Sequence, residues 1–305
     1  MERALRNRLT FGPIMLATLI GLLWLDHMVQ IWTASPTGAM WRSHGVAGVG
    51  ILALLLIVLP IATIELAALF SAERIEPYPV IALAGSWSLA IHAFLTQFQA
   101  FQRVSASTLA FIIVFVMILA ALRRALGRQT HQAIAHMAGT VLATMYLGGL
   151  AWFLMALRVK QSSRVEGFHG STMIILMILL VVKFTDIGAF FGGRALGKHK
   201  LIPWLSPGKT WEGLFFGLLT AGIVGAICAR WIGRPDYRLF WWQGFLFGVI
   251  IGGIGQLGDL LESLMKRDAE VKDSGQLVPG FGGILDIIDS PLLAAPFAYL
   301  LFSLF

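Results

Sequence analysis

The sequence is poor in charged residues and almost free of cysteine, and each shortage excludes a class of protein. Charged side chains make up 13% of the 305 residues, whereas soluble globular chains carry about 25%. Hydrophobic residues reach 57%, and the mean hydropathy is +0.79. This composition excludes a mainly water-soluble chain. It predicts an all-α, polytopic integral membrane protein with a single membrane domain over residues 1–305.

The single cysteine, Cys228, lies inside an apolar run. One cysteine cannot form an internal disulfide or a cysteine-based metal site, so we interpret it as a packed thiol. The seven histidines are scattered along the chain rather than clustered. Metal chemistry in this protein would therefore rest on oxygen ligands.

Two nucleotide-binding patterns are incomplete. Residues 208–210 (GKT) resemble the end of a Walker A loop, but Pro203 stands where that pattern requires glycine. Residues 253–258 (GIGQLG) match a dinucleotide fingerprint by their letters. That segment lies within an apolar run that no strand precedes, which favours close packing of helices through small residues.

Long apolar runs are abundant. A helix needs about 20 apolar residues to cross the hydrocarbon core, and backbone groups in lipid must be satisfied internally, which requires helices rather than open strands. The fourth run is the shortest, and the third is the least hydrophobic. We expect about nine transmembrane helices, at 12–32, 46–70, 79–99, 107–122, 133–157, 171–191, 211–230, 241–263 and 284–304.

Basic residues between these runs predict the orientation. Fourteen Lys and Arg residues fall on the N-terminal side and eight, including Arg158, on the other, while Lys183 lies within a run. The positive-inside rule therefore places the N-terminus in the cytoplasm, together with the loops after the sixth and eighth helices. Contact with anionic headgroups accounts for the net charge of +7 better than nucleic-acid binding does.

Acidic residues concentrate in the final 120 residues of the chain. Ten of the sixteen lie at or after Asp186. We therefore interpret residues 1–170 as a helical scaffold and residues 171–305 as catalytic helices with cytoplasmic loops.

A stripe of polar residues marks the end of the eighth run. Asp259, Glu262, Ser263 and Lys266 are spaced at i, i+3, i+4 and i+7, which places them on one helical face. Asp286 and Asp289 form a second i, i+3 pair at the start of the ninth run. Carboxylates without nearby His or Cys favour Mg²⁺, Mn²⁺ or Ca²⁺. The alternative is a structural ion network in which Lys266 and Arg267 pair with Asp259 and Glu262.

Two further segments are suited to phosphate groups. Lys272 and Asp273 precede a loop with Gly275, Gly280, Gly282 and Gly283, whose backbone can turn sharply and approach a ligand before the ninth helix begins. The other segment follows the sixth run, which holds Lys183 and Asp186 three residues apart. Its basic residues suit a lipid phosphate or a triphosphate, although ordinary positive-inside charge explains most of them: Arg194, Lys198, Lys200 and Lys209.

These regions resemble the phosphatidate cytidylyltransferase (CDP-diacylglycerol synthase) family. The resemblance covers about residues 183–291, and before that only general hydrophobicity supports it. Three positions depart from the family's pattern: Gly208 replaces a lysine, Phe281 a histidine and Ile287 an arginine. The matching positions are Asp186, Gly193, Arg194, Gly197, Lys198, Ser206, Pro207, Lys209, Thr210, Gly258, Asp259, Ser263, Lys266, Arg267, Lys272, Asp273, Pro279, Gly280, Gly282, Gly283, Asp286 and Asp289.

The resemblance implies a reaction of CTP with phosphatidate that gives CDP-diacylglycerol and pyrophosphate in phospholipid biosynthesis. It implies Mg²⁺, with a second cation, Mg²⁺ or K⁺, as an option. The metal ligands would be Asp259, Glu262, Asp286 and Asp289, and the catalytic residues Asp259, Asp286, Asp289 and Lys266. The substrates would be bound by Asp186, Arg194, Lys209, Ser263, Arg267, Lys272, Asp273, Gly282 and Gly283.

The expected location is the cell's inner (cytoplasmic) membrane, with the site facing the cytoplasm. The partners would be CTP, phosphatidate and membrane lipids, without nucleic acid, and a homodimer stays open. Two other functions also stay open: a CTP-dependent lipid or polyprenol kinase, and a non-enzymatic, ion-coupled transporter that uses intramembrane carboxylates. A catalytically weakened relative is a further option because of Phe281 and Ile287.

Overall fold

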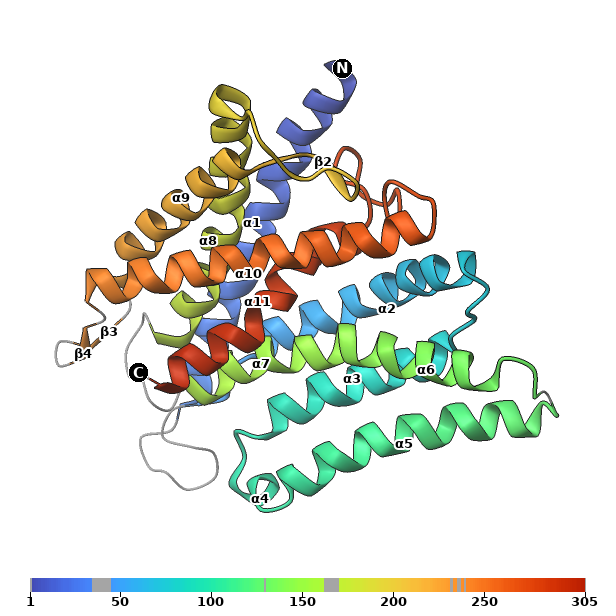
Figure 1. Ribbon diagram of the computed structural model, residues 1–305. Helices are drawn as coiled ribbons and strands as arrows, with labels where there is room; N and C mark the ends of the chain where they lie inside the picture. Colours follow the sequence, from blue (N-terminus) through green and yellow to red (C-terminus); the bar gives the residue numbers. More distant parts are fainter. Residues whose placement is uncertain are drawn as a thin grey trace. The chain divides into compact units, whose positions relative to one another are not determined.

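The protein is an all-α, multi-pass membrane protein, as the sequence predicts (Figure 1). The computed structural model describes residues 2–34, 45–128, 130–161, 170–230, 233–234, 237–238 and 240–304. Within these residues, eight helices are long and apolar enough to cross a membrane. The expected number of about nine crossings stays a prediction, because α3 (Pro79–Leu95) is a shorter apolar helix of 17 residues.

The helices follow the apolar runs closely. A single run, 133–157, forms a helix that is interrupted by one π-helical turn, η1. The prediction of the shortest helix was wrong: the fourth run forms a helix of 22 residues, and α3 is the short one. The elements are α1 Glu2–Thr33, α2 Val49–Ala72, α3 Pro79–Leu95, α4 Gln99–Gln102, α5 Ser105–Leu126, α6 Ala133–Thr144, η1 Met145–Gly149, α7 Leu150–Gln161, α8 Gly170–Leu196, α9 Trp211–Ala229, α10 Trp241–Asp268 and α11 Leu285–Leu304.

Two small antiparallel hairpins complete the described part of the chain. The first pairs β1 (Lys200–Ile202) with β2 (Ser206–Thr210), so that Lys200 lies opposite Thr210. The second pairs β3 (Gly233–Arg234) with β4 (Tyr237–Arg238). The β1–β2 hairpin joins α8 to α9, and it therefore shapes the basic loop that the sequence marks.

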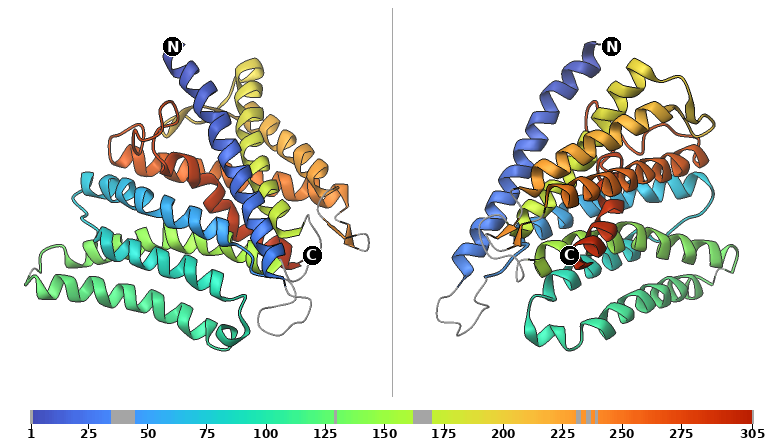
Figure 2. Two further views of the ribbon diagram at one scale, coloured as in Figure 1. Left: turned by 180° about the vertical axis from the view of Figure 1, so that it is seen from behind. Right: turned by 60° about the vertical axis from the view of Figure 1, so that its left-hand side comes forward.

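The chain forms two compact units. The first consists of Met1–Lys160 and Asp268–Ile287, and the second of Gln161–Arg267 and Ile288–Phe305. In the first unit, α2, α3, α5 and the α6–η1–α7 segment lie side by side (Figure 1). In the second, α8 and α9 lie against each other in all the views (Figure 2). The boundaries pass through the polar segment at the end of α10 and the start of α11.

A fully buried ion pair ties helices of the first unit together. Arg158 on α7 donates from Nε to Asp26 Oδ2 on α1 at 2.5 Å, and neither side chain is exposed. The other carboxylate oxygen of Asp26 accepts the backbone N–H of Gly50. The prediction that Arg158 lies in a loop was therefore wrong. Arg158 lies within α7, and Asp26 neutralises its charge. Burial of an unpaired charge within a membrane protein costs free energy, and pairing of Arg158 with Asp26 reduces that cost for both residues.

Small residues let the helices of the second unit approach closely. A Cβ at Gly258 on α10 would lie 2.9 Å from Ser290 Cα on α11, which is too close for any larger residue. A Cβ at Gly255 would meet Val182 of α8 at 3.2 Å. The packing interpretation of residues 253–258 is confirmed, and it brings α10 and α11 together where both carry carboxylates.

Candidate functional site

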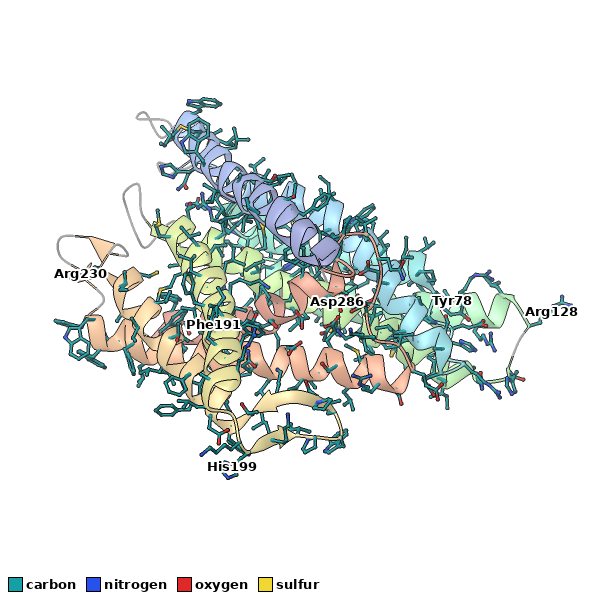
Figure 3. All side chains as sticks on the ribbon, turned by 90° about the horizontal axis from the view of Figure 1, so that it is seen from above. Tyr78, Arg128, Phe191, His199, Arg230 and Asp286 are labelled. Atoms are coloured by element: carbon teal, nitrogen blue, oxygen red, sulfur yellow. The ribbon has the colours of Figure 1, made fainter. Side chains whose placement is uncertain are left out.

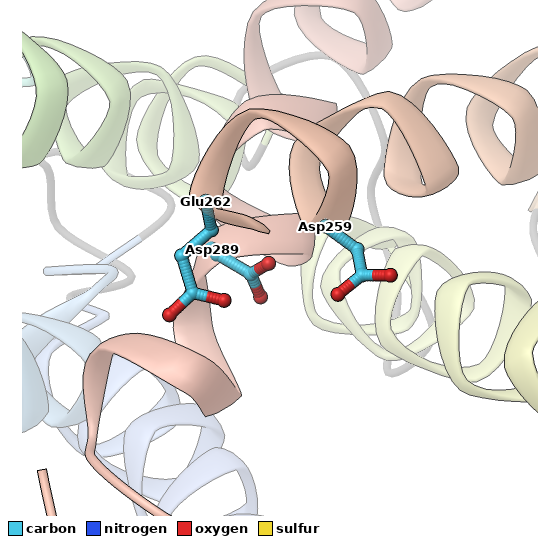
Figure 4. Close-up of side chains that lie close together, drawn as sticks. All are labelled: Asp259, Glu262 and Asp289. Carbon is cyan, nitrogen blue, oxygen red and sulfur yellow. The ribbon is translucent and has the colours of Figure 1, made fainter. Parts of the chain in front are cut away.

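Three carboxylates of the second unit form one cluster. Asp259 and Glu262 lie one turn apart on α10, Asp289 lies on α11, and one oxygen from each falls within 4.8 Å of the others (Figure 4). Glu262 is 1% exposed and Asp289 is 3% exposed. Like charges so close together and so poorly solvated repel one another strongly. The cluster therefore requires protons or cations.

Two lysines supply part of that positive charge. Lys266 Nζ lies 2.8 Å from Glu262 Oε2, one helical turn away on α10. Lys209 Nζ, from strand β2, lies 2.5 Å from Asp259 Oδ2. The ion network considered from the sequence therefore exists for Glu262 and Lys266. Arg267 is not part of it: its Nε donates to the carbonyl of Leu205 at 3.4 Å.

Gln256 links a fourth carboxylate to this cluster. Its Nε2 donates to Asp186 Oδ1 on α8 at 2.7 Å, and its Oε1 accepts from Lys209 Nζ at 3.0 Å. No sequence motif included Gln256. A signal was present, because Gln256 stands three residues before Asp259 and thus extends the polar stripe of α10 by one position.

The β1–β2 hairpin positions Lys209. Thr210 caps α9, since its Oγ1 accepts the backbone N–H of Gly213 at 3.1 Å. Glu212, in the first turn of α9, accepts the backbone N–H groups of Lys198 and His199 and contacts the His199 ring at 2.6 Å. His199 lies at the start of the hairpin in Figure 3. Glu212 therefore ties the start of this loop to the first turn of α9, a role that the sequence alone did not suggest.

A second group of carboxylates organises the glycine-rich loop in the first unit. Asp286 (Figure 3) accepts the backbone N–H groups of Gly283 at 2.7 Å and Ser274 at 3.2 Å on its Oδ2. Glu65, from α2, accepts those of Ile284 at 3.0 Å and Leu285 at 2.8 Å. The N–H groups that the sequence offered to a phosphate thus donate to these two side chains. Glu65 was singled out in no motif, because its partners lie more than 200 positions away.

The glycines of this loop fit around those carboxylates. A Cβ at Gly283 would lie 2.6 Å from Glu65 Oε2 and would also overlap Ser274 Oγ. Gly282 has φ +94°, a left-handed conformation that favours glycine, and a Cβ there would overlap Asp286 Oδ2. The close approach of the Glu65 and Asp286 carboxylates therefore explains why glycine occupies both positions.

A model of the Cytidylyltransferase family matches residues 6–305. The chain belongs to the Cytidylyltransferase family. The resemblance inferred from the polar motifs is confirmed. It also extends over the apolar first half of the chain, which contains none of those motifs.

Individual relatives cover less of this cytidylyltransferase-family chain. A phosphatidate cytidylyltransferase of Haemophilus influenzae is 44% identical over 148 residues, which are 47% of this chain and 50% of that protein. One of Bacillus subtilis is 38% identical over 164 residues, 54% of this chain and 57% of that protein. An uncharacterized protein of Escherichia coli K12 is 37% identical over 166 residues, 54% of this chain and 52% of that protein. The chain spans about half the length of the curated relatives it matches.

The site residues of this cytidylyltransferase-family protein divide between the two units. In the second unit, Arg194 is exposed at the end of α8 and Ser263 is partly buried on α10. The second unit brings together Asp186, Lys209, Asp259, Glu262, Lys266 and Asp289. The first unit holds Lys272, Asp273, Gly282, Gly283 and Asp286, of which Lys272 and Asp273 are exposed.

The carboxylate trio suits a hard divalent cation. Its donor set consists only of oxygen, which matches Mg²⁺, Mn²⁺ or Ca²⁺ and disfavours metals that prefer nitrogen or sulfur. Asp259, with its side chain 39% exposed, is the most accessible of the three. A cation held there would compete with Lys209 for that carboxylate.

Proposed function

We propose that this protein transfers CMP from CTP to phosphatidate, giving CDP-diacylglycerol and pyrophosphate. The observation that carries the proposal is the cluster of Asp259, Glu262 and Asp289, flanked by Lys209 and Lys266, in a chain of the Cytidylyltransferase family. The names of the Haemophilus and Bacillus relatives support the same substrates.

The chemistry fits the charges of this site. A phosphatidate oxygen attacks the α-phosphorus of CTP, a new phosphoanhydride bond forms, and the bond between the α- and β-phosphorus atoms breaks to release pyrophosphate. The attacking phosphate is already ionised at neutral pH, so no general base is needed. The principal barrier is the repulsion between two anionic reactants, which positioned cations reduce.

We assign the metal ligands to Asp259, Glu262 and Asp289. Mg²⁺ bound there would offset charge on the triphosphate and on the departing pyrophosphate. Asp286 stays a proposed ligand and catalytic residue, although the contacts of its Oδ2 give it a role in holding the glycine-rich loop. A second cation, Mg²⁺ or K⁺, stays part of the proposal.

The remaining predicted residues are assigned to the substrates. Basic side chains would neutralise phosphates, with Lys209 and Lys266 nearest the carboxylates. Gln256 is added as the residue that positions Lys209. The substrate-binding set stays Asp186, Arg194, Lys209, Ser263, Arg267, Lys272, Asp273, Gly282 and Gly283, with Lys266 at the reacting phosphates.

We also propose the orientation predicted from the basic residues. The site faces the cytoplasm, which supplies soluble CTP. Phosphatidate enters from the cytoplasmic leaflet of the inner membrane. A homodimer stays an untested part of the proposal.

The test is a product assay with purified protein, labelled CTP, phosphatidate and Mg²⁺. We expect labelled CDP-lipid and pyrophosphate from the native chain, and a loss of at least about 100-fold in rate for Asp259→Ala and Asp289→Asn. Asp268→Asn, which removes an exposed carboxylate from the end of the same helix, is the matched control and should keep the native rate.

Other products would indicate a different function. Phosphorylated lipid together with CDP would identify a CTP-dependent lipid kinase. If CTP is not consumed under any condition, the enzymatic proposal is wrong. Membership of the Cytidylyltransferase family does not favour the transporter.

A further inference from the structure

Lys209 occupies a specific place among the carboxylates of the second unit. Its ammonium lies 2.5 Å from Asp259 Oδ2 and 3.0 Å from Gln256 Oε1, and the side chain is 17% exposed. Asp259 and Gln256 lie on α10, whereas Lys209 comes from strand β2. The lysine is thus held by another element, and it can leave without any change in the α10 backbone.

The orientation of Gln256 follows from its partners. An ammonium is only a donor, so the amide oxygen of Gln256 must face Lys209. The amide nitrogen then faces Asp186 Oδ1, 2.7 Å away, which accepts as a carboxylate. A flipped amide would set donor against donor and acceptor against acceptor. Because Gln256 is 7% exposed, this arrangement is fixed, and the amide oxygen is a defined anchor for the lysine.

The other lysine of the cluster is tied differently. Lys266 pairs with Glu262 at i, i+4 on the same helix, with side-chain exposures of 13% and 1%. The short connection keeps Lys266 near its carboxylate whatever else binds. Of these two lysines, Lys209 is therefore the one that can be exchanged, and its partner Asp259 is more exposed than Glu262.

We propose that Lys209 is the resident counter-ion of Asp259, positioned by Gln256, and that a divalent cation displaces it from that carboxylate. The released ammonium becomes available to the triphosphate. This inference rests on the metal site of the proposed function. It predicts an order of events in which metal binding precedes the engagement of Lys209 with the nucleotide.

The first measurement is Mn²⁺ affinity by electron paramagnetic resonance on the full chain in lipid nanodiscs. We expect Lys209→Met to bind Mn²⁺ roughly three- to tenfold more tightly than the native protein, because its competitor is gone. Lys209→Arg keeps the charge and should stay within about twofold of native. Lys198→Met removes the same charge from the same exposed loop and should also stay within about twofold.

The second measurement separates displacement from simple repulsion. The reactivity of Lys209 toward an amine-acylating reagent is followed by mass spectrometry, with Lys198 as the internal reference. Reactivity should rise severalfold as Mn²⁺ saturates the native protein. Gln256→Leu should raise it before any metal is added and should also tighten Mn²⁺ binding, because the lysine has lost its anchor.

Three results would overturn the inference. They are unchanged or weaker Mn²⁺ binding in Lys209→Met, constant reactivity of Lys209 across the Mn²⁺ titration, and absence of Mn²⁺ binding in every variant. Competition between Mn²⁺ and Lys209 in a protein that makes no CDP-lipid would uphold the inference and overturn only the proposed function.

Discussion

The carboxylate of Glu65 accepts a hydrogen bond from the backbone N–H of Leu285 at 2.8 Å, although 220 positions separate the two residues. The same side chain accepts from Ile284 N–H at 3.0 Å and from Ser274 Oγ at 3.4 Å. Glu65 is 8% exposed. It therefore satisfies the first turn of α11 and fixes the glycine-rich loop from within the first unit.

Removal of this carboxylate should loosen the loop locally. In Glu65→Ala, two helix N–H groups lose their acceptor, at an expected cost of about 1–3 kcal/mol. Hydrogen exchange of peptides covering residues 274–286 should accelerate by about tenfold or more. Glu65→Gln keeps one acceptor and should fall between native and alanine. Glu73→Ala, at the exposed end of α2, should leave this exchange unchanged, and an equal effect there would contradict the assignment.

Gly283 should tolerate no larger side chain. Gly283→Ala places a methyl group against Glu65 and Ser274, so we expect a loss of about 1–3 kcal/mol in stability together with reduced CDP-lipid formation. Gly208→Ala is the matched control, because a Cβ there meets nothing within 4 Å. Thermal unfolding in detergent measures both, and equal unfolding temperatures would show that the loop has room to adjust.

Arg158 and Asp26 should be costly to separate but replaceable together. Arg158→Met leaves Asp26 charged and buried, and we expect a loss of about 3–5 kcal/mol. The double variant Arg158→Met with Asp26→Asn removes both charges and should recover most of that loss. Unfolding titrations of the single and double variants measure the coupling. Additive losses would show that the 2.5 Å contact does not couple the two residues.

Activity should depend on a hard divalent cation. Chelation by EDTA should abolish CDP-lipid formation, and Mg²⁺ or Mn²⁺ should restore it, because the cluster offers only carboxylate oxygens. Zn²⁺ should not restore activity. Full activity after exhaustive chelation would remove the metal from the proposed mechanism.

The helices were predictable because a span of about 20 apolar residues has one stable arrangement in lipid. The proximity of Asp259 to Glu262 was predictable for a similar reason, since i, i+3 spacing fixes it within one helix. The family motifs then indicated which polar residues belong together between Lys183 and Pro291.

The contacts that the sequence did not reveal join distant elements. Arg158 and Asp26 are 132 positions apart, and Gln256 and Asp186 are 70 apart. Such pairs depend on which helix faces meet, and hydrophobic periodicity does not determine this when a helix is apolar on all sides. Glu65 illustrates the limit: in isolation it is only an acidic residue within an apolar run.

The contact between Glu65 and α11 also bears on how the protein is made. Synthesis runs from the N-terminus, so α2 is produced long before the N–H groups that its carboxylate accepts. Until α11 follows, Glu65 must rely on water or a proton. Completion of the loop is therefore a late event in biogenesis, and chains stopped short of residue 284 would carry an unsatisfied acidic group that membrane quality control could recognise.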